Sequence, residues 1–145
     1  MARVMTTEKL QLGSVVQYAY LWQHERLKGV EYPKDRPVCL VLKLEAGQGM
    51  YHYALAAISD QKPKDPRDGL EIPITEIKRG GLNVSRTAYI HLNELNLDST
   101  YNSAALFYRM PTKGRFSGVF VQKITKQLID NIRTKRAVLI SRGEH

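Results

Sequence analysis

The tightest constraint on this chain is an arginine–proline pair joined directly to an apolar run, in residues 34–42 (KDRPVCLVL). Proline fixes its own φ and lacks an amide hydrogen, so it is accepted as the first residue of a strand but not in the middle of one. The residues that follow, 38–42, are apolar and rich in β-formers, which predicts a buried strand. Arg36 is therefore expected at the mouth of a core strand with its head group exposed, where its planar fork of five donors can hold an anion.

Composition limits the class of protein. A length of 145 residues with 43% hydrophobic content predicts one ordered domain with a modest core. The net charge of +8 predicts a polyanionic or acidic partner, and both nucleic acid and an acidic protein fit. The single cysteine, Cys39, leaves no internal disulfide and lies in the apolar run, so we expect a small core residue. Metal-site spacings of Cys and His, signal-type segments and membrane-length apolar stretches are missing, so we expect a cytoplasmic protein with no cofactor, no metal and no membrane contact.

The hydrophobic pattern predicts mostly short strands and one late helix. Strands are expected near 15–22, from 36 or 37 to 44, and at 50–58, 70–74, 87–92 and 106–110, with polar loops at 24–35 and 59–68. Apolar residues at helical spacing predict a helix over 126–133 with Thr125 as its cap. This order predicts a small, mostly antiparallel barrel or an α+β domain. Residues 1–12 are expected to form an N-terminal tail, 13–133 the single domain, and 134–145 a basic C-terminal tail that continues the helix or hangs loose.

Five short motifs and the helix occur in an order that has a counterpart in a known family. The motifs are 13–16 (GSVV), 35–38 (DRPV), 56–59 (AAIS), 70–73 (LEIP) and 89–96 (YIHLNELN), followed by the helix near 124–132. In this order, over about residues 13–133, the chain resembles the MazF/PemK (Kid-like) toxins of bacterial type II toxin–antitoxin systems. The resemblance implies a mostly β fold, a small SH3-like β-barrel with a C-terminal α-helix (MazF/CcdB-like), usually a homodimer. It further implies a sequence-specific endoribonuclease that cuts single-stranded mRNA without metal, by way of a 2′,3′-cyclic phosphate, and that a cognate acidic antitoxin neutralises.

The same resemblance suggests which residues would carry the chemistry. Arg36 would grip the scissile phosphate by charge-assisted hydrogen bonds. Ser59 stands where the family often has threonine, and its hydroxyl could bind phosphate or orient the arginine. His91 and Asn93 fall where Kid-like members carry a catalytic arginine and aspartate. Histidine is a credible acid or base, whereas asparagine cannot abstract a proton, and Glu94 is then a possible substitute, although strand alternation places it on the face opposite His91 and Asn93.

The loop before Arg36 supplies a second acid–base candidate in His24 and Glu25. Each of these residues also has a purely structural interpretation. Arg36 could pair on the surface with Asp35 or Glu31, Ser59 could satisfy backbone groups at a strand end, and a lone strand histidine such as His91 is usually structural.

Basic and aromatic residues in the loops predict an RNA path. The cations could track the backbone while one of Tyr18, Tyr20, Trp22 or Tyr32 stacks on unpaired bases. The basic set is Lys34, Lys62, Lys64, Arg67, Lys78, Arg79 and Arg86. Because the acid–base set is incomplete, a second hypothesis stays open, a non-catalytic MazF/CcdB-fold binding module such as a gyrase-poisoning toxin or an RNA-binding regulator.

Overall fold

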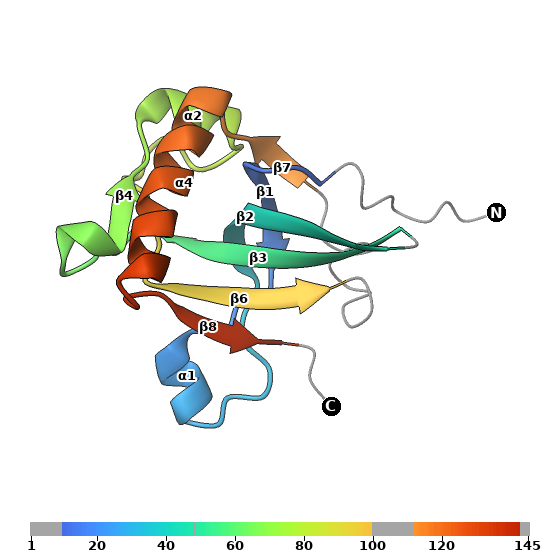
Figure 1. Ribbon diagram of the computed structural model, residues 1–145. Coiled ribbons are helices and arrows are strands. Elements are labelled where there is room, and N and C mark those ends of the chain that lie inside the picture. Colours follow the sequence, from blue (N-terminus) through green and yellow to red (C-terminus); the bar gives the residue numbers. More distant parts are fainter. Residues whose placement is uncertain (1–9, 48, 100–111, 143–145) are drawn as a thin grey trace.

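The computed structural model describes residues 10–47, 49–99 and 112–142 of the chain (Figure 1). Within these residues, eight strands form one sheet, accompanied by three α-helices and a short 3-10 turn at Pro66–Asp68. The strands are β1 (Ser14–Tyr18), β2 (Arg36–Gly47), β3 (Met50–Ser59), β4 (Gly69–Glu71), β5 (Tyr89–His91), β6 (Glu94–Ser99), β7 (Thr112–Arg115) and β8 (Val138–Ser141). The helices are α1 (Gln23–Leu27), α2 (Ile74–Arg79) and α4 (Gly118–Arg133).

The sheet runs in the order β4-β5-β3-β2-β1-β7, and β6 lies between β3 and β8. All of these pairs are antiparallel except β6 with β8, which is parallel. Among the described residues the sheet is not closed. The predicted mostly β class is therefore confirmed, whereas the SH3-like barrel stays a prediction.

The long hairpin of β2 and β3 organises the sheet, and its start confirms the expected strand at the arginine–proline pair. β2 begins at Arg36, opposite Tyr18 at the end of β1, and Pro37 lies opposite Gln17. β3 pairs with β6 along its first half and with β5 at its end, where Ser59 lies opposite Tyr89. The ends of β1 and β3 and the start of β2 therefore meet at the open end of the hairpin.

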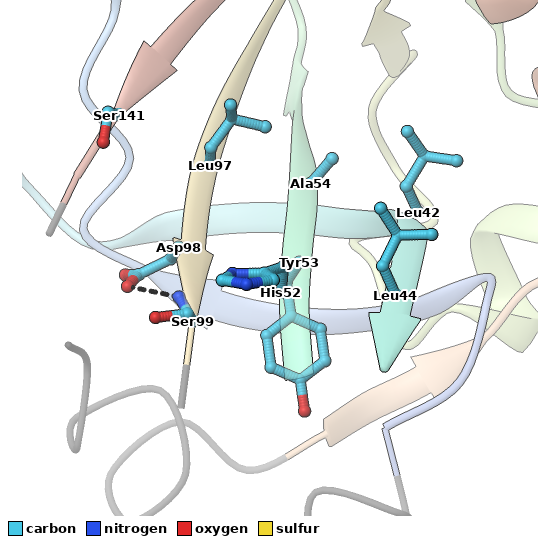
Figure 2. A pocket seen from close by; sticks show the side chains of 9 residues that line it. All are labelled: Leu42, Leu44, His52, Tyr53, Ala54, Leu97, Asp98, Ser99 and Ser141. Atoms are coloured by element: carbon cyan, nitrogen blue, oxygen red, sulfur yellow. Dashed lines mark hydrogen bonds between the residues drawn. The ribbon is translucent and has the colours of Figure 1, made fainter. Parts of the chain in front are cut away.

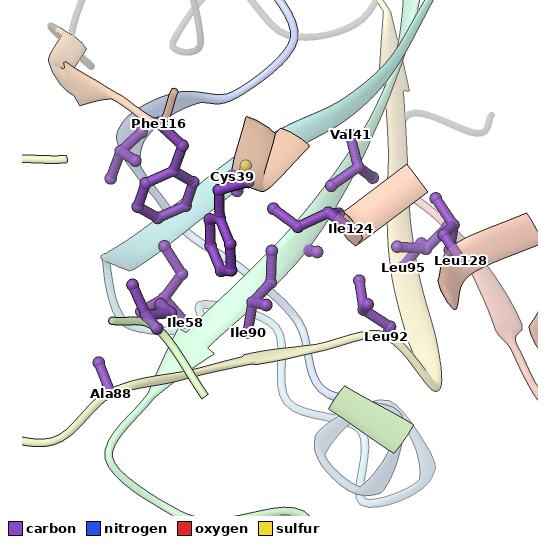
Figure 3. Packing of buried hydrophobic residues seen from close by; sticks show 14 of the residues in the cluster. Cys39, Val41, Ile58, Ala88, Ile90, Leu92, Leu95, Phe116, Ile124 and Leu128 are labelled. Carbon is purple, nitrogen blue, oxygen red and sulfur yellow. The ribbon is translucent and has the colours of Figure 1, made fainter. Parts of the chain in front are cut away.

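The alternation of β2 builds a separate core on each face of the sheet. Cys39 and Val41 face the larger cluster, which α4 covers, and Val38 and Leu40 face a smaller cluster. Figure 3 shows Ile124 of α4 in the larger cluster near Val41. Cys39 is fully buried, as expected.

The helix α4 begins eight residues earlier than predicted. Ser117 caps it by accepting a hydrogen bond from the Phe120 amide at 3.2 Å, so the predicted cap, Thr125, lies within the helix. The carboxylate of Glu76, on α2, in turn accepts from the Ser117 amide at 2.8 Å and from its hydroxyl at 2.6 Å. This contact holds α2 beside the start of α4, and Figure 1 shows α2 and the start of α4 at the top of the view and α1 at the bottom.

Other predicted elements differ because distant contacts decide them. Residues 74–79 form α2 rather than the end of a strand, the segment 24–35 opens with α1, and the first strand ends at Tyr18. Residues 112–115 form β7, where the sequence pattern predicts no strand, and 138–141 form β8 rather than a loose tail. The strand predicted at 106–110 lies outside the described residues. In the described ranges, no helix has the length and apolar character needed to cross a membrane.

Candidate functional site

A pocket of about 510 Å³ lies where four separate segments meet. Its lining comes from the start of α1, the end of β3, the loop 61–68 and the junction between β5 and β6. Five of the residues that the sequence predicts to be catalytic line it together, although they are up to 70 positions apart in the chain. These residues are His24, Ser59, His91, Asn93 and Glu94.

Arg36 lies beside this pocket, next to the indole of Trp22. The Arg36 Cζ atom is 5.9 Å from the centroid of the Trp22 ring, and Trp22 lines the pocket. Its Nη2 donates to Glu25 Oε2 at 3.2 Å and its Nε donates to the Lys34 carbonyl at 3.3 Å. The expected surface pairs with Asp35 or Glu31 are therefore replaced by a pair with Glu25. The side chain is only 20% exposed, which corrects the expectation of an exposed head group.

Trp22 is the central side chain of the site. It packs edge-on against His91, with ring centroids 5.2 Å apart, and nearly parallel to His24, with centroids 6.1 Å apart and 15° between the planes. It also forms the N-cap of α1, where its amide donates to Glu25 Oε1 at 3.1 Å. Glu25 thus fixes both the start of α1 and the guanidinium of Arg36.

The geometry around His91 defines its protonation. Its Nε2 lies 2.9 Å from the Gln61 carbonyl oxygen, and a carbonyl can only accept, so Nε2 carries the hydrogen. Burial lowers the pKa of His91, and it outweighs the opposing effects of the Gln61 carbonyl and Asp68. The ring is therefore neutral near pH 7, with its lone pair on Nδ1.

The pKa of Glu94 is shifted upward, whereas that of His91 is shifted downward. Burial raises the pKa of its carboxyl, against the hydrogen bonds from Gln23 and Tyr20 and the charge of His24, which lower it. The Gln23 amide and the Tyr20 hydroxyl both donate to Oε1, at 3.0 and 3.2 Å. Strand alternation separates Glu94 from His91, but β5 ends at His91 and β6 begins at Glu94, so the alternation is interrupted and both residues line the pocket.

Ser59 and Asn93 complete the predicted set. The Ser59 hydroxyl accepts a hydrogen bond from the Gln61 amide at 3.0 Å, which matches its structural interpretation, while its hydrogen stays able to donate into the pocket. Asn93 Oδ1 is buried and has no hydrogen-bond partner among the described residues.

The predicted basic residues fall into separate groups. Lys62 and Lys64 line the pocket. Arg67 and Arg86 form exposed ion pairs with Asp65 and Asp60, at 2.8 and 3.2 Å. Lys34 lies outside the pocket lining, where its carbonyl accepts from Arg36 Nε. Lys78 and Arg79 end α2, where the Arg79 carbonyl packs against Gly114 of β7.

The aromatic candidates are also separated by burial. Tyr18 and Tyr20 are 4% and 0% exposed and donate their hydroxyls to Asp98 and Glu94, so neither can stack on a base. Tyr32 is 90% exposed in the connection between α1 and β2, outside the pocket lining. Trp22 is the predicted stacking residue that reaches the pocket.

Two residues that the sequence did not single out hold the pocket loop in place. Gln61 orients His91 through its carbonyl, and Arg136 Nη2 lies 3.0 Å from Asp65 Oδ2 and 2.6 Å from Asp68 Oδ1. The Gln61 contact uses the backbone, which leaves no signal in residue type. Arg136 belongs to a basic segment that was expected to be a tail, and only its distant partners reveal its role.

A second cavity of about 380 Å³ lies on the sheet between β2, β3, β6 and β8 (Figure 2). Its lining is mostly apolar, with Leu42, Leu44 and Leu97 around His52, and it contains none of the predicted site residues. In the part of the chain that the structure describes, no group of three or more His, Cys, Asp or Glu side chains is placed to hold a metal ion.

Neither a scan against protein-family models nor a search of curated proteins found a match for this chain. The MazF/PemK resemblance therefore remains a hypothesis from sequence motifs, and the pocket geometry is the basis on which a function can be proposed.

Proposed function

We propose that this chain is a metal-independent, sequence-specific endoribonuclease of the MazF/PemK kind that cleaves single-stranded RNA. The observation that carries the proposal is the gathering of His24, Ser59, His91 and Glu94 in one pocket, with Arg36 beside the Trp22 ring that lines it. Cleavage by the RNA's own 2′-hydroxyl requires a base, an acid and stabilisation of the charge on the phosphoryl oxygens. Two imidazoles and a fixed guanidinium can supply these three functions.

The proposed reaction uses the substrate's 2′-hydroxyl as the nucleophile. Neutral His91 accepts the 2′-proton at Nδ1 while the 2′-oxygen bonds to phosphorus. The bond from phosphorus to the 5′-oxygen then breaks, and His24 in its protonated form donates a proton to that oxygen. The products are a 2′,3′-cyclic phosphate and a free 5′-hydroxyl, and the need for a 2′-hydroxyl selects RNA over DNA.

Arg36 and the two pocket lysines would stabilise the charge that grows on the phosphoryl oxygens. Among the described residues, the Arg36 guanidinium donates to Glu25 and to the Lys34 carbonyl, which leaves further N–H groups of its fork for a phosphate. Lys62 and Lys64 line the pocket from the loop 61–68. Hydrogen bonds from these cations to a charged phosphate are charge-assisted, and such bonds are roughly twice as strong as bonds between neutral groups.

A non-catalytic RNA-binding module is the second candidate function. It is favoured by the ion pair of Arg36 with Glu25, which neutralises the main phosphate ligand, and by Asn93 in place of an acid. We further propose, on the net charge of +8 and the motif resemblance, a cognate acidic antitoxin as partner and a homodimer as the working form.

Incubation of the purified protein with a long single-stranded RNA in EDTA separates the two functions. We expect discrete fragments from the wild type and from Arg133→Ala, a matched arginine variant on α4, and about 100- to 1,000-fold slower cleavage by Arg36→Ala, because a positioned transition-state donor is lost. Intact RNA across varied sequences, together with retained binding, would establish the binding module instead.

A further inference from the structure

The pocket presents an aromatic surface next to positive charge. Trp22 and His24 are nearly parallel and both line it, as do Lys62 and Lys64. Trp22 is half-buried, and its ring and that of His91 meet in a T-shaped arrangement, which restrains the indole. Rigid aromatic faces beside lysines are the usual means by which proteins hold unpaired bases of single-stranded nucleic acid.

One residue that lines the same pocket carries an unsatisfied polar atom. Asn93 Oδ1 is buried and accepts no hydrogen bond from the described residues, although buried carbonyl oxygens are nearly always paired. Asn93 sits between His91 and Glu94 at the β5–β6 junction and lines the pocket. A ligand with a hydrogen-bond donor on a planar edge would satisfy this oxygen, and every unpaired nucleobase offers such an edge through a ring N–H or an exocyclic amine.

We infer that this pocket holds one unpaired nucleobase, which stacks on Trp22 and His24 and donates from its edge to Asn93, while the adjoining phosphates contact Lys62 and Lys64. This inference rests on the proposed function, because it places part of a single-stranded RNA substrate in the catalytic pocket. It makes Asn93 a residue that holds the edge of the base, which gives the asparagine a role that proton transfer cannot.

Trp22 provides the measurement, since it is the only tryptophan of the chain and its fluorescence reports on the pocket. The probe is a 12-nucleotide single strand of 2′-O-methyl RNA with all four bases, which the proposed reaction cannot cut. The comparison probe is an abasic strand of the same length and charge. We expect saturable quenching with the base-containing strand and none with the abasic strand. His24→Ala and Asn93→Leu should weaken the base-dependent binding roughly 5- to 100-fold, while His52→Ala, an exposed histidine outside the pocket, should not.

Two results would overturn the inference. Equal quenching by the abasic strand would mean that phosphates alone occupy the pocket. An absence of quenching in protein that cuts RNA in EDTA would remove the base site and leave the nuclease standing. Base-dependent quenching in protein that never cuts RNA would support the base site and remove the nuclease. Circular dichroism of each variant shows that a loss of binding is not a loss of fold.

Discussion

The guanidinium of Arg36 forms a mostly buried ion pair with Glu25, and breaking this pair should destabilise the fold. Arg36 and Glu25 are 20% and 19% exposed, and Glu25 also caps the first turn of α1. Two demands therefore act on one side chain, the ion pair and the proposed phosphate contact. A half-buried pair with fixed geometry contributes more than an exposed one, which is typically worth 0–1 kcal/mol.

Replacing Arg36 with lysine separates charge from geometry. Lysine keeps the positive charge but loses the planar fork, so we expect Arg36→Lys to recover only a small part of the cleavage that Arg36→Ala loses. Arg36→Ala should lower the free energy of unfolding by about 1–2 kcal/mol, because Glu25 is left without its partner. Urea unfolding and RNA cleavage measured on the same preparations test this. Full activity in Arg36→Ala, or a loss of activity that merely follows the unfolded fraction, would contradict it.

His91 makes stability and activity depend on pH in a defined direction. Its pKa in the folded protein is below the ordinary value of about 6.5, so the unfolded chain binds more protons between the two values. Stability from this group is therefore complete above about pH 6.5 and is lost as the pH falls towards the folded pKa. We also expect the cleavage rate to fall below pH 6.5, because protonated His91 cannot act as the base. His91→Gln should remove this pH dependence of stability and should abolish cleavage.

Urea unfolding between pH 4.5 and 8, with the matched variant His52→Gln, provides the measurement. A stability that rises as the pH is lowered through 6.5 would contradict a neutral buried imidazole. Cleavage by His91→Gln at the wild-type rate would contradict its role as the base.

At the scale of elements, the segment after α4 anchors the loop that carries the pocket lysines. Arg136 bridges Asp65 and Asp68, and Asn131, fully buried on α4, donates to the carbonyls of Arg67 and Leu92, both at 2.9 Å. The C-terminal third of the chain therefore holds the β3–β4 connection against the β5–β6 junction. The pocket depends on α4 although no side chain of that helix lines it.

We expect Arg136→Ala to weaken RNA binding severalfold even though Arg136 lies outside the pocket lining, because loop 61–68 loses its anchor. The free energy of unfolding should fall by about 1–3 kcal/mol, the usual cost of leaving half-buried hydrogen-bonding groups without their partner. Fluorescence anisotropy with a labelled single strand measures the binding, and Arg133→Ala serves as the control for lost charge. Equal weakening in the two variants would assign the effect to charge alone.

Local signals predicted the elements that local chemistry decides. Pro37 and the apolar run after it placed the start of β2 correctly, because a proline restricts its own backbone wherever the chain folds. The start of α4 was missed because Ser117 and Gly118 are typical of loops, and the cap depends on Glu76, 41 positions earlier. β8 was missed because its pairing with β6 joins residues far apart in the sequence.

The site shows the same contrast between features that local sequence decides and features that distant contacts decide. Its residue types were predictable from motifs, but their proximity was not. The tryptophan between Arg36 and His91, the Gln61 carbonyl and the interruption of the strand between His91 and Glu94 all arise from tertiary contacts that no periodicity encodes.

At the scale of the whole molecule, one sheet with a core on each face brings every part of the pocket to a single edge. The chain has a net charge of +8, so binding to a single-stranded nucleic acid should release counterions. We expect the logarithm of the affinity to fall linearly with the logarithm of salt concentration, with a slope of about −0.7 for each phosphate contacted. The double variant Lys62→Gln, Lys64→Gln should make the slope shallower by the amount expected for roughly one to two lost phosphate contacts. An unchanged slope in this double variant would place the RNA backbone elsewhere.

The most direct test of the central claim is a single atomic change in the substrate. Once a cut site is mapped on a single-stranded RNA in EDTA, the ribose on the 5′ side of the scissile phosphate is replaced by deoxyribose in an otherwise identical strand. If the 2′-hydroxyl is the nucleophile, this strand binds as before but is not cut there, and the parent strand yields a 2′,3′-cyclic phosphate end. Cleavage that persists at the deoxyribose position would contradict the mechanism.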